Sequence, residues 1–145
     1  MNALIPVVNG SEEMEVVIVA DVLRRAAWRV VIAGLNPGAI TAAHGVRLLP
    51  DAEWNAIKPD TFDWLIIPGG AEGVAAMARD ERVLSVVRQF AAAQKPLAAI
   101  CAGPLVLQAA GVLTGRRVTC HPGVSAELTQ GARNNERVVI DGHLI

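Results

Sequence analysis

The sequence contains no tyrosine, and aromatic residues of any kind account for only 3% of its 145 positions. It also lacks an excess of positive charge, because 13 lysines and arginines stand against 14 aspartates and glutamates for a formal net charge of −1. A protein that holds nucleic acid needs positive charge for the phosphates and often uses aromatic rings for the bases. Membrane proteins commonly carry aromatic side chains at the lipid interface. We therefore expect neither nucleic acid nor a membrane as the partner.

Cysteine is equally scarce, with Cys101 and Cys120 as the only two. They lack the C-x-x-C spacing of a zinc site or a dithiol redox motif, and cysteine and histidine do not occur at the spacing of a metal site. Two cysteines are too few for a disulfide scaffold, and no basic segment precedes the short apolar start as it does in a signal peptide. These absences predict a cytoplasmic protein that holds no metal.

One uncharged stretch, residues 96–115, has about the length of a membrane span. Gly103 and Pro104 fall inside it, and both residues disfavour a continuous helix. We therefore predict a strand, a sharp turn and a helix in this stretch instead of a transmembrane helix.

The remaining composition, with 52% hydrophobic residues, is typical of one globular domain with an aliphatic core. Short apolar runs alternate with helical patterns, which indicates an α/β fold with a mostly parallel sheet. No repeat or long linker interrupts this alternation, so residues 1–145 are expected to form a single domain. Strands are predicted at residues 4–8, 29–33, 64–67, 97–100 and 118–119, a strand or hairpin at 40–49, and helices at about 12–27, 73–93 and 104–110.

The end of the chain predicts a further β-hairpin, because Asp141 and Gly142 form a favourable two-residue turn between two short apolar runs. The sequence then stops inside an apolar strand, with no polar tail or covering helix after it. Such an end would leave an unpaired strand edge. We therefore expect a domain that is truncated at its carboxyl end.

The start of the first predicted helix is rich in polar residues. Ser11 is a suitable N-cap, and Glu12 and Glu13 place negative charge where the helix dipole is positive. We interpret these two glutamates as capping charges only. The sequence offers no partner for His44.

Candidate chemistry gathers where predicted strands end, since ligands of a parallel α/β sheet bind at the carboxyl ends of its strands. Cys101 stands between a strand and a helix, flanked by small residues that permit a strained turn, as in a nucleophile elbow. Free N–H groups at the helix start favour a thiolate, so we predict a lowered pKa for Cys101. The alternative is that Cys101 is a small buried hydrophobic residue. Cys120 lacks such a turn and is more typical of packing, with a secondary redox role beside His121 left open.

Other strand ends supply partners for such a thiol. Glu15 is either a carboxyl group that lies over the thiol and moves a proton, or a solvated carboxylate at a helix start. The N–H groups of Gly70 and Ala102 would form an oxyanion hole if Gly70 faces Cys101, although a simple turn also explains this glycine. His121 either orients or deprotonates the thiol, or is a loop histidine before a proline.

Together these motifs resemble the ThiJ/PfpI superfamily, and most closely its branch that contains the human parkinsonism-associated deglycase. The resemblance covers the whole chain in four motifs in the family's order, at residues 9–15 (NGSEEME), 67–70 (IPGG), 99–104 (AICAGP) and 120–122 (CHP). It implies a flavodoxin-like three-layer sandwich, usually a homodimer. The resemblance also implies a readily oxidised cysteine at Cys101, a protonated glutamate at Glu15 that hydrogen-bonds it, oxyanion donors at Gly70 and Ala102, and a nearby histidine at His121.

Members of this superfamily act without a cofactor as glyoxalases on methylglyoxal and, in a disputed activity, as deglycases of early sugar adducts. The resemblance therefore implies a cysteine-dependent glyoxalase or deglycase whose substrate is a small reactive aldehyde or a glycated molecule. The alternative is a redox-sensing or chaperone-like stress protein in which Cys101 is oxidised to a sulfinate.

Three departures from the superfamily's patterns narrow the choice among its branches and the extent of the expected domain. Ala102 follows the nucleophile where the protease-like members have a histidine, and Pro122 follows His121 where glutamine amidotransferases require His-x-Glu. Members also continue past the final hairpin into another strand and a closing helix, whereas this sequence ends at Ile145. The resemblance therefore implies a domain without those last two elements.

Overall fold

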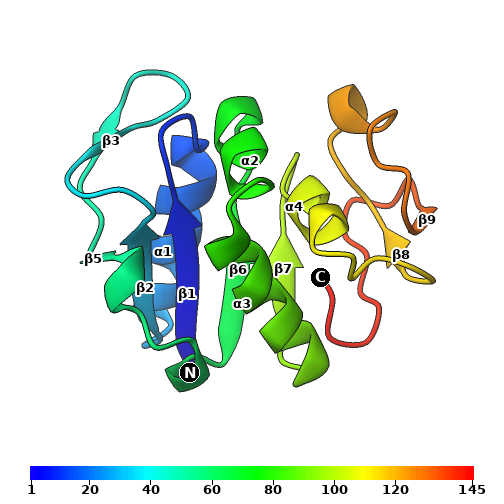
Figure 1. Ribbon diagram of the computed structural model, residues 1–145, viewed down its shortest axis with the longest axis horizontal. Helices are drawn as coiled ribbons and strands as arrows, with labels where there is room; N and C mark the ends of the chain where they lie inside the picture. Colours follow the sequence, from blue (N-terminus) through cyan, green and yellow to red (C-terminus); the bar gives the residue numbers. More distant parts are fainter.

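The computed structural model describes residues 1–145 and shows a three-layer α/β sandwich around a parallel sheet of five strands (Figure 1). The strand order is β5-β2-β1-β6-β7, and every neighbouring pair in this sheet is parallel. This arrangement confirms the predicted α/β class and follows the flavodoxin-like order around a central β1. The strands are β1 (Asn2–Val7), β2 (Arg29–Gly34), β5 (Ala52–Glu53), β6 (Trp64–Ile67) and β7 (Leu97–Ala99).

The sheet is covered on both faces, which explains why its central strands are continuous apolar runs. Helix α1 (Glu13–Arg25) covers one face, and α2 (Ala71–Met77), α3 (Glu81–Ala92) and α4 (Pro104–Ala109) cover the other (Figure 1). On the α1 side, Val16 packs in an apolar cluster with Ile5 of β1. On the opposite side, Phe90 and Leu4 belong to a larger cluster. The two packed faces fix the positions of the strand ends.

Two helix boundaries differ from the prediction. Glu12, not Ser11, is the N-cap of α1, because the buried Ser11 hydroxyl accepts a hydrogen bond from the N–H of Val8 at 3.0 Å. The single helix predicted at residues 73–93 is two helices, and it breaks at Asp80, whose side chain caps α3 by accepting from the N–H of Arg82. In both places a local side-chain hydrogen bond decides the boundary.

Shorter strands complete the secondary structure. Of the two alternatives predicted for residues 40–49, a strand or a hairpin, the structure has the hairpin, formed by the antiparallel pair β3 (Ile40–Thr41) and β4 (Arg47–Leu48). Beyond α4, β8 (Arg117–Val118) pairs in parallel with β9 (Ala132–Arg133). The edge strand β5 was not predicted, because two residues between turns carry no periodic signal.

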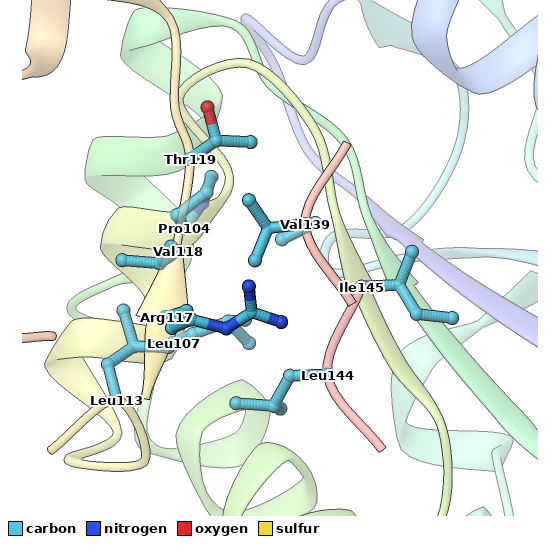
Figure 2. Close-up of a pocket in the computed structure, with 10 residues that line it drawn as sticks. Pro104, Leu107, Leu113, Arg117, Val118, Thr119, Val139, Leu144 and Ile145 are labelled. Atoms are coloured by element: carbon cyan, nitrogen blue, oxygen red, sulfur yellow. The ribbon is translucent and has the colours of Figure 1, made fainter. Parts of the chain in front are cut away.

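The predicted terminal hairpin is reduced to one antiparallel pair, Asp141 with Leu144, around a turn at residues 142–143 that lies one residue later than predicted. Leu144 forms a parallel bridge with Leu97 of β7, where the N–H of Ile145 donates to the carbonyl of Leu97 at 2.9 Å. The N–H of Arg117 also donates to the carboxylate of Asp141 at 2.8 Å. Figure 2 shows Val139 and Leu144 facing α4 and β8 across a cavity of about 30 Å³. The last residues therefore lie beside β7 at the edge of the main sheet.

An apolar hollow of about 350 Å³ lies beside α1 on the face of the sheet. The rings of Trp28 and Trp64 line it with their centroids 5.5 Å apart, together with Leu23, Ile66 and Ile145.

None of the helices combines the length and the apolar character that crossing a bilayer requires.

Candidate active site

The site forms where three adjacent strands end. Glu15 lies in the first turn of α1 after β1, Gly70 follows β6, and Cys101 follows β7. Because β1, β6 and β7 are neighbours in the sheet, their carboxyl ends bring these residues together at one edge. The predicted convergence of the motifs is thus present in the fold.

Cys101 occupies a strained turn between β7 and α4. Its φ is 61°, in the left-handed region that L-residues rarely adopt. Gly103 makes this turn possible, since a Cβ at that position would lie 2.7 Å from the carbonyl oxygen of Ile67. The strain and the tight packing together hold the half-buried thiol at the edge of the sheet.

Glu15 is held directly beside the thiol. Its Oε2 accepts a hydrogen bond from the N–H of Gly69 at 2.6 Å, and its carboxyl group also interacts with the thiol of Cys101. Gly69 permits this approach because a Cβ there would lie 2.5 Å from Oε2 of Glu15 and 2.8 Å from Cβ of Cys101. The carboxyl group is therefore fixed where it can exchange a proton with sulfur.

The electrostatics of the thiol differ from the prediction. Burial raises the pKa of Cys101, and the negative charge of Glu15 raises it further, although the N–H of Ala102 acts in the opposite direction. The lowered pKa predicted from the helix start is wrong, because burial and a nearby carboxylate outweigh the N–H groups. The site thus favours the protonated thiol of Cys101.

Two backbone N–H groups near the thiol have no oxygen acceptor in the protein. The N–H groups of Gly70 and Ala102 donate to no carbonyl or carboxylate, and that of Ala102 points toward the sulfur of Cys101. Gly70 has a φ of 92°, and a Cβ there would lie 2.6 Å from the backbone nitrogen of Glu12. Only glycine fits this position, and its N–H remains free for a ligand.

His121 lines the same cavity as Glu15 and Cys101, which has a volume of about 460 Å³. Its backbone N–H donates to the carbonyl of Cys101 at 2.9 Å. Its ring is exposed, and Nδ1 accepts a hydrogen bond from the N–H of Gly123 at 3.0 Å. The structure thus places the histidine in the cavity wall without a hydrogen bond from its ring to the thiol.

A second polar cluster was missed by the sequence analysis. The backbone N–H of His44 donates to the carboxylate of Glu13 at 3.1 Å, and Nδ1 of His44 lies 3.3 Å from Oε2 of Glu12. The backbone N–H of Glu13 lowers the pKa of its own carboxyl group, and His44 acts in the same direction. The donor atoms of these residues lie within 4.8 Å of one another, a spacing that a cation would accept. No pattern revealed this cluster, because the β3–β4 hairpin and α1 meet only in the fold.

The comparison with known families agrees with this geometry. A family model described as the DJ-1/PfpI family matches residues 1–145. The chain belongs to the DJ-1/PfpI family. The crystal structure of DJ-1beta from Drosophila melanogaster superposes on this DJ-1/PfpI chain with a TM-score of 0.95 and 38% identity, covering 99% of this chain and 78% of the fly chain.

Curated relatives in the DJ-1/PfpI family include proteins with enzymatic names. The chain is 36% identical to the glutathione-independent glyoxalase DJR-1.2 of Caenorhabditis elegans, over 94% of this chain and 74% of the nematode protein. It is 31% identical to a deglycase of Pyrococcus horikoshii, over 100% of this chain and 88% of that protein. It also spans a third of Protein DJ-1 homolog B of Arabidopsis thaliana, 33% of that protein's length, at 38% identity. A general glyoxalase or deglycase activity is therefore found among relatives of this DJ-1/PfpI chain.

A substitution at Gly69 tests how tightly the site is packed. We expect Gly69→Ala to displace Glu15 or Cys101, because the new Cβ would lie within 2.8 Å of both side chains. Such overpacking costs about 1–3 kcal/mol. Thermal unfolding should show this loss, and alkylation of Cys101 should change in rate.

Gly111→Ala is the matched control. A Cβ at Gly111 meets no atom within 4 Å, but the residue has a φ of 77°. This variant should lose about 1 kcal/mol from backbone strain alone and leave alkylation of Cys101 unchanged. Equal alkylation rates in the two variants would show that Gly69 does not shape the site.

Proposed function

We propose that this protein is a cysteine-dependent, cofactor-free glyoxalase that converts methylglyoxal or a related 2-oxoaldehyde to a 2-hydroxy acid. The observation that supports it most is the position of Cys101 between the carboxyl group of Glu15 and the free N–H groups of Gly70 and Ala102. A nucleophile, a proton carrier and two oxyanion donors around one point are the groups that this reaction needs. The enzymatic names of the relatives support the same activity.

In the first step, the sulfur of Cys101 attacks the aldehyde carbon while Glu15 removes the thiol proton. General-base assistance suits a thiol whose pKa is raised by its surroundings, since a free thiolate is scarce at neutral pH. The electron pair of the carbonyl moves to its oxygen, which the N–H groups of Gly70 and Ala102 stabilise. Proton transfer from Glu15 to this oxygen completes a hemithioacetal.

In the second step, the Glu15 carboxylate removes the proton from the former aldehyde carbon and returns it to the neighbouring carbon. The hydroxyl proton of the hemithioacetal passes to the ketone oxygen, so the first carbon becomes a thioester carbonyl and the ketone becomes a hydroxyl group. Water then hydrolyses the thioester, which releases the 2-hydroxy acid and regenerates the thiol. The net reaction adds one water to the oxoaldehyde and needs no external oxidant or reductant.

The same site would act on early glycation adducts. Such an adduct joins the aldehyde carbon to an amine, thiol or guanidinium group, and attack by Cys101 at this carbon expels that group. The cavity beside Cys101 offers about 460 Å³, which is room for a small aldehyde together with part of the side chain that carries it. His121 lies in the cavity wall as a contact for this larger substrate.

The direct test is lactate formation from methylglyoxal by the purified protein, without added glutathione or metal. We expect turnover under these conditions, with D-lactate and L-lactate measured separately. No lactate from a protein whose circular dichroism shows the folded α/β domain would refute the proposed activity.

We also propose that the protein is a homodimer. Met14, Ile18 and Val22 form an apolar stripe on the outer face of α1, each more than half exposed, and Leu49 of the neighbouring hairpin is 79% exposed. Such a stripe is self-complementary in a twofold dimer. Sedimentation equilibrium should give twice the monomer mass for the wild type.

Charge in the middle of this stripe should separate the subunits. We expect Ile18→Asp to be monomeric, because an aspartate would be buried without a partner in the interface. Ala92→Asp, at an exposed position of α3 on the other side of the sheet, is the control and should remain dimeric. A monomeric wild type at every concentration would contradict the dimer.

A further inference from the structure

The second cysteine lies beside the first. Cys120 lies two residues after the end of the short strand β8, separated from it by Thr119. It is half-buried, like Cys101. Both cysteines are free, and both line the cavity of about 460 Å³ at the edge of the sheet. One side of Cys120 also packs against the large apolar cluster that contains Ala102.

Backbone geometry fixes how far apart the two cysteines are. The N–H of His121, the residue after Cys120, donates to the carbonyl oxygen of Cys101 at 2.9 Å. This bond joins the main chains next to the two cysteines, and standard bond lengths then keep the Cα atoms of Cys101 and Cys120 within about 8 Å of each other. Disulfides span Cα distances of about 4.4–6.8 Å, a range that this pair reaches with at most a small movement of the turn at Cys101.

We propose that Cys120 is a resolving cysteine, which captures oxidised Cys101 as an intramolecular disulfide and makes this site a thiol-dependent reductase of small hydroperoxides. The proposal shares the nucleophilic Cys101 with the proposed glyoxalase function but needs no turnover of aldehydes. It assigns a role to Cys120, which the glyoxalase mechanism leaves unused.

The reaction balances in two steps. The sulfur of Cys101 attacks the terminal oxygen of a hydroperoxide, the O–O bond breaks, and an alcohol leaves with the thiol proton, which gives a sulfenic acid. The sulfur of Cys120 then attacks the sulfur of Cys101, and the hydroxyl group leaves as water with the proton of Cys120. Two thiols are oxidised by two electrons, and the hydroperoxide is reduced to alcohol and water. Two equivalents of a small external thiol restore both cysteines.

The competing fate of the sulfenic acid is a second oxidation to sulfinate, which thiols do not reverse. A thiol in the same cavity as Cys101 reacts within the molecule, whereas the second oxidation requires another hydroperoxide from solution. At a low concentration of hydroperoxide, the structure therefore favours the disulfide over the sulfinate.

Mass spectrometry of the full chain tests the disulfide directly. The protein is treated with one equivalent of cumene hydroperoxide, blocked with N-ethylmaleimide and digested with trypsin without reduction. Cleavage after Arg116 and Arg117 separates the two cysteines, so a disulfide joins two peptides that are otherwise independent. We expect these joined peptides in the wild type, and their separation after dithiothreitol. Their absence, with Cys101 recovered as sulfinate, would overturn the proposal.

Cys120→Ser supplies the quantitative comparison, because serine has a similar size and no resolving thiol. We expect its sulfinate to accumulate at least tenfold faster than that of the wild type, and its sulfenic acid to be trapped by dimedone. Equal rates of sulfinate formation would also overturn the proposal. Lactate formation is measured on the same samples: joined peptides without lactate would refute only the glyoxalase, and lactate without joined peptides would refute only the resolving role.

Discussion

Cys101→Ala should abolish lactate formation from methylglyoxal, with a loss of kcat/KM of at least about a thousandfold. Without the sulfur no hemithioacetal forms, and neither Glu15 nor the free N–H groups can act on a substrate that is not attached to the protein. The variant should fold normally, because the half-buried thiol fills little of the core and alanine is smaller. Steady-state kinetics with separate assays for the two lactate enantiomers provide the measurement.

Cys120→Ser is the matched control for this loss. It removes the other thiol of the same cavity, and Cys120 has no part in the proposed aldehyde chemistry. We expect its turnover to stay within about twofold of the wild type, as is usual for a small change outside the reacting groups. If Cys101→Ala retained full turnover, the lactate would have to arise from a different group, and the proposed nucleophile would be incorrect.

Glu15→Gln should affect catalysis and thiol reactivity in opposite directions. Loss of the proton carrier should lower kcat by about 10²–10⁴-fold, the usual range for a general acid or base. The charge of Glu15 raises the pKa of Cys101, so its removal should lower that pKa and increase the thiolate fraction at neutral pH. The variant should therefore react faster with iodoacetamide while it turns over more slowly.

The pH profile of Cys101 alkylation shows whether Glu15→Gln lowers or raises the pKa of the thiol. Alkylation of the wild type should rise only as the pH passes the ordinary range of a thiol, and the Glu15→Gln profile should be displaced to lower pH. Glu81→Gln, at an exposed glutamate on the far side of the sheet, should leave the profile unchanged. Turnover that survives Glu15→Gln would show that Glu15 is not the proton shuttle.

The sequence was most informative where local geometry decides the structure. Small residues around Cys101 predicted a strained turn, and its φ of 61° agrees with that prediction. The run at residues 64–67 predicted a strand, which is β6. Motifs at the ends of parallel strands predicted a common site, because the topology of a parallel sheet places those ends along one edge.

Predictions failed where the outcome depends on contacts between distant segments. The pKa of Cys101 depends on burial and on the charge of Glu15, and neither is visible at the helix start that suggested a thiolate. The terminal turn lies one residue later than predicted, where Arg117 binds the carboxylate of Asp141 and Leu144 pairs with both Asp141 and β7. His44 gains its partners only when the β3–β4 hairpin docks on α1. Local patterns carry no information about such partners.

The meeting of three strand ends also has a consequence for folding. Glu15, Gly70 and Cys101 are far apart in the sequence, and only the pairing of β1 with β6 and of β6 with β7 brings them together. Non-local parallel pairing is a slow step, because the chain loses loop entropy before the contacts form. In partly folded species that contain only the first two strands and α1, Glu15 is therefore in place but Cys101 does not yet lie beside it. The candidate site is therefore assembled only when β7, the strand before Cys101, has joined the sheet.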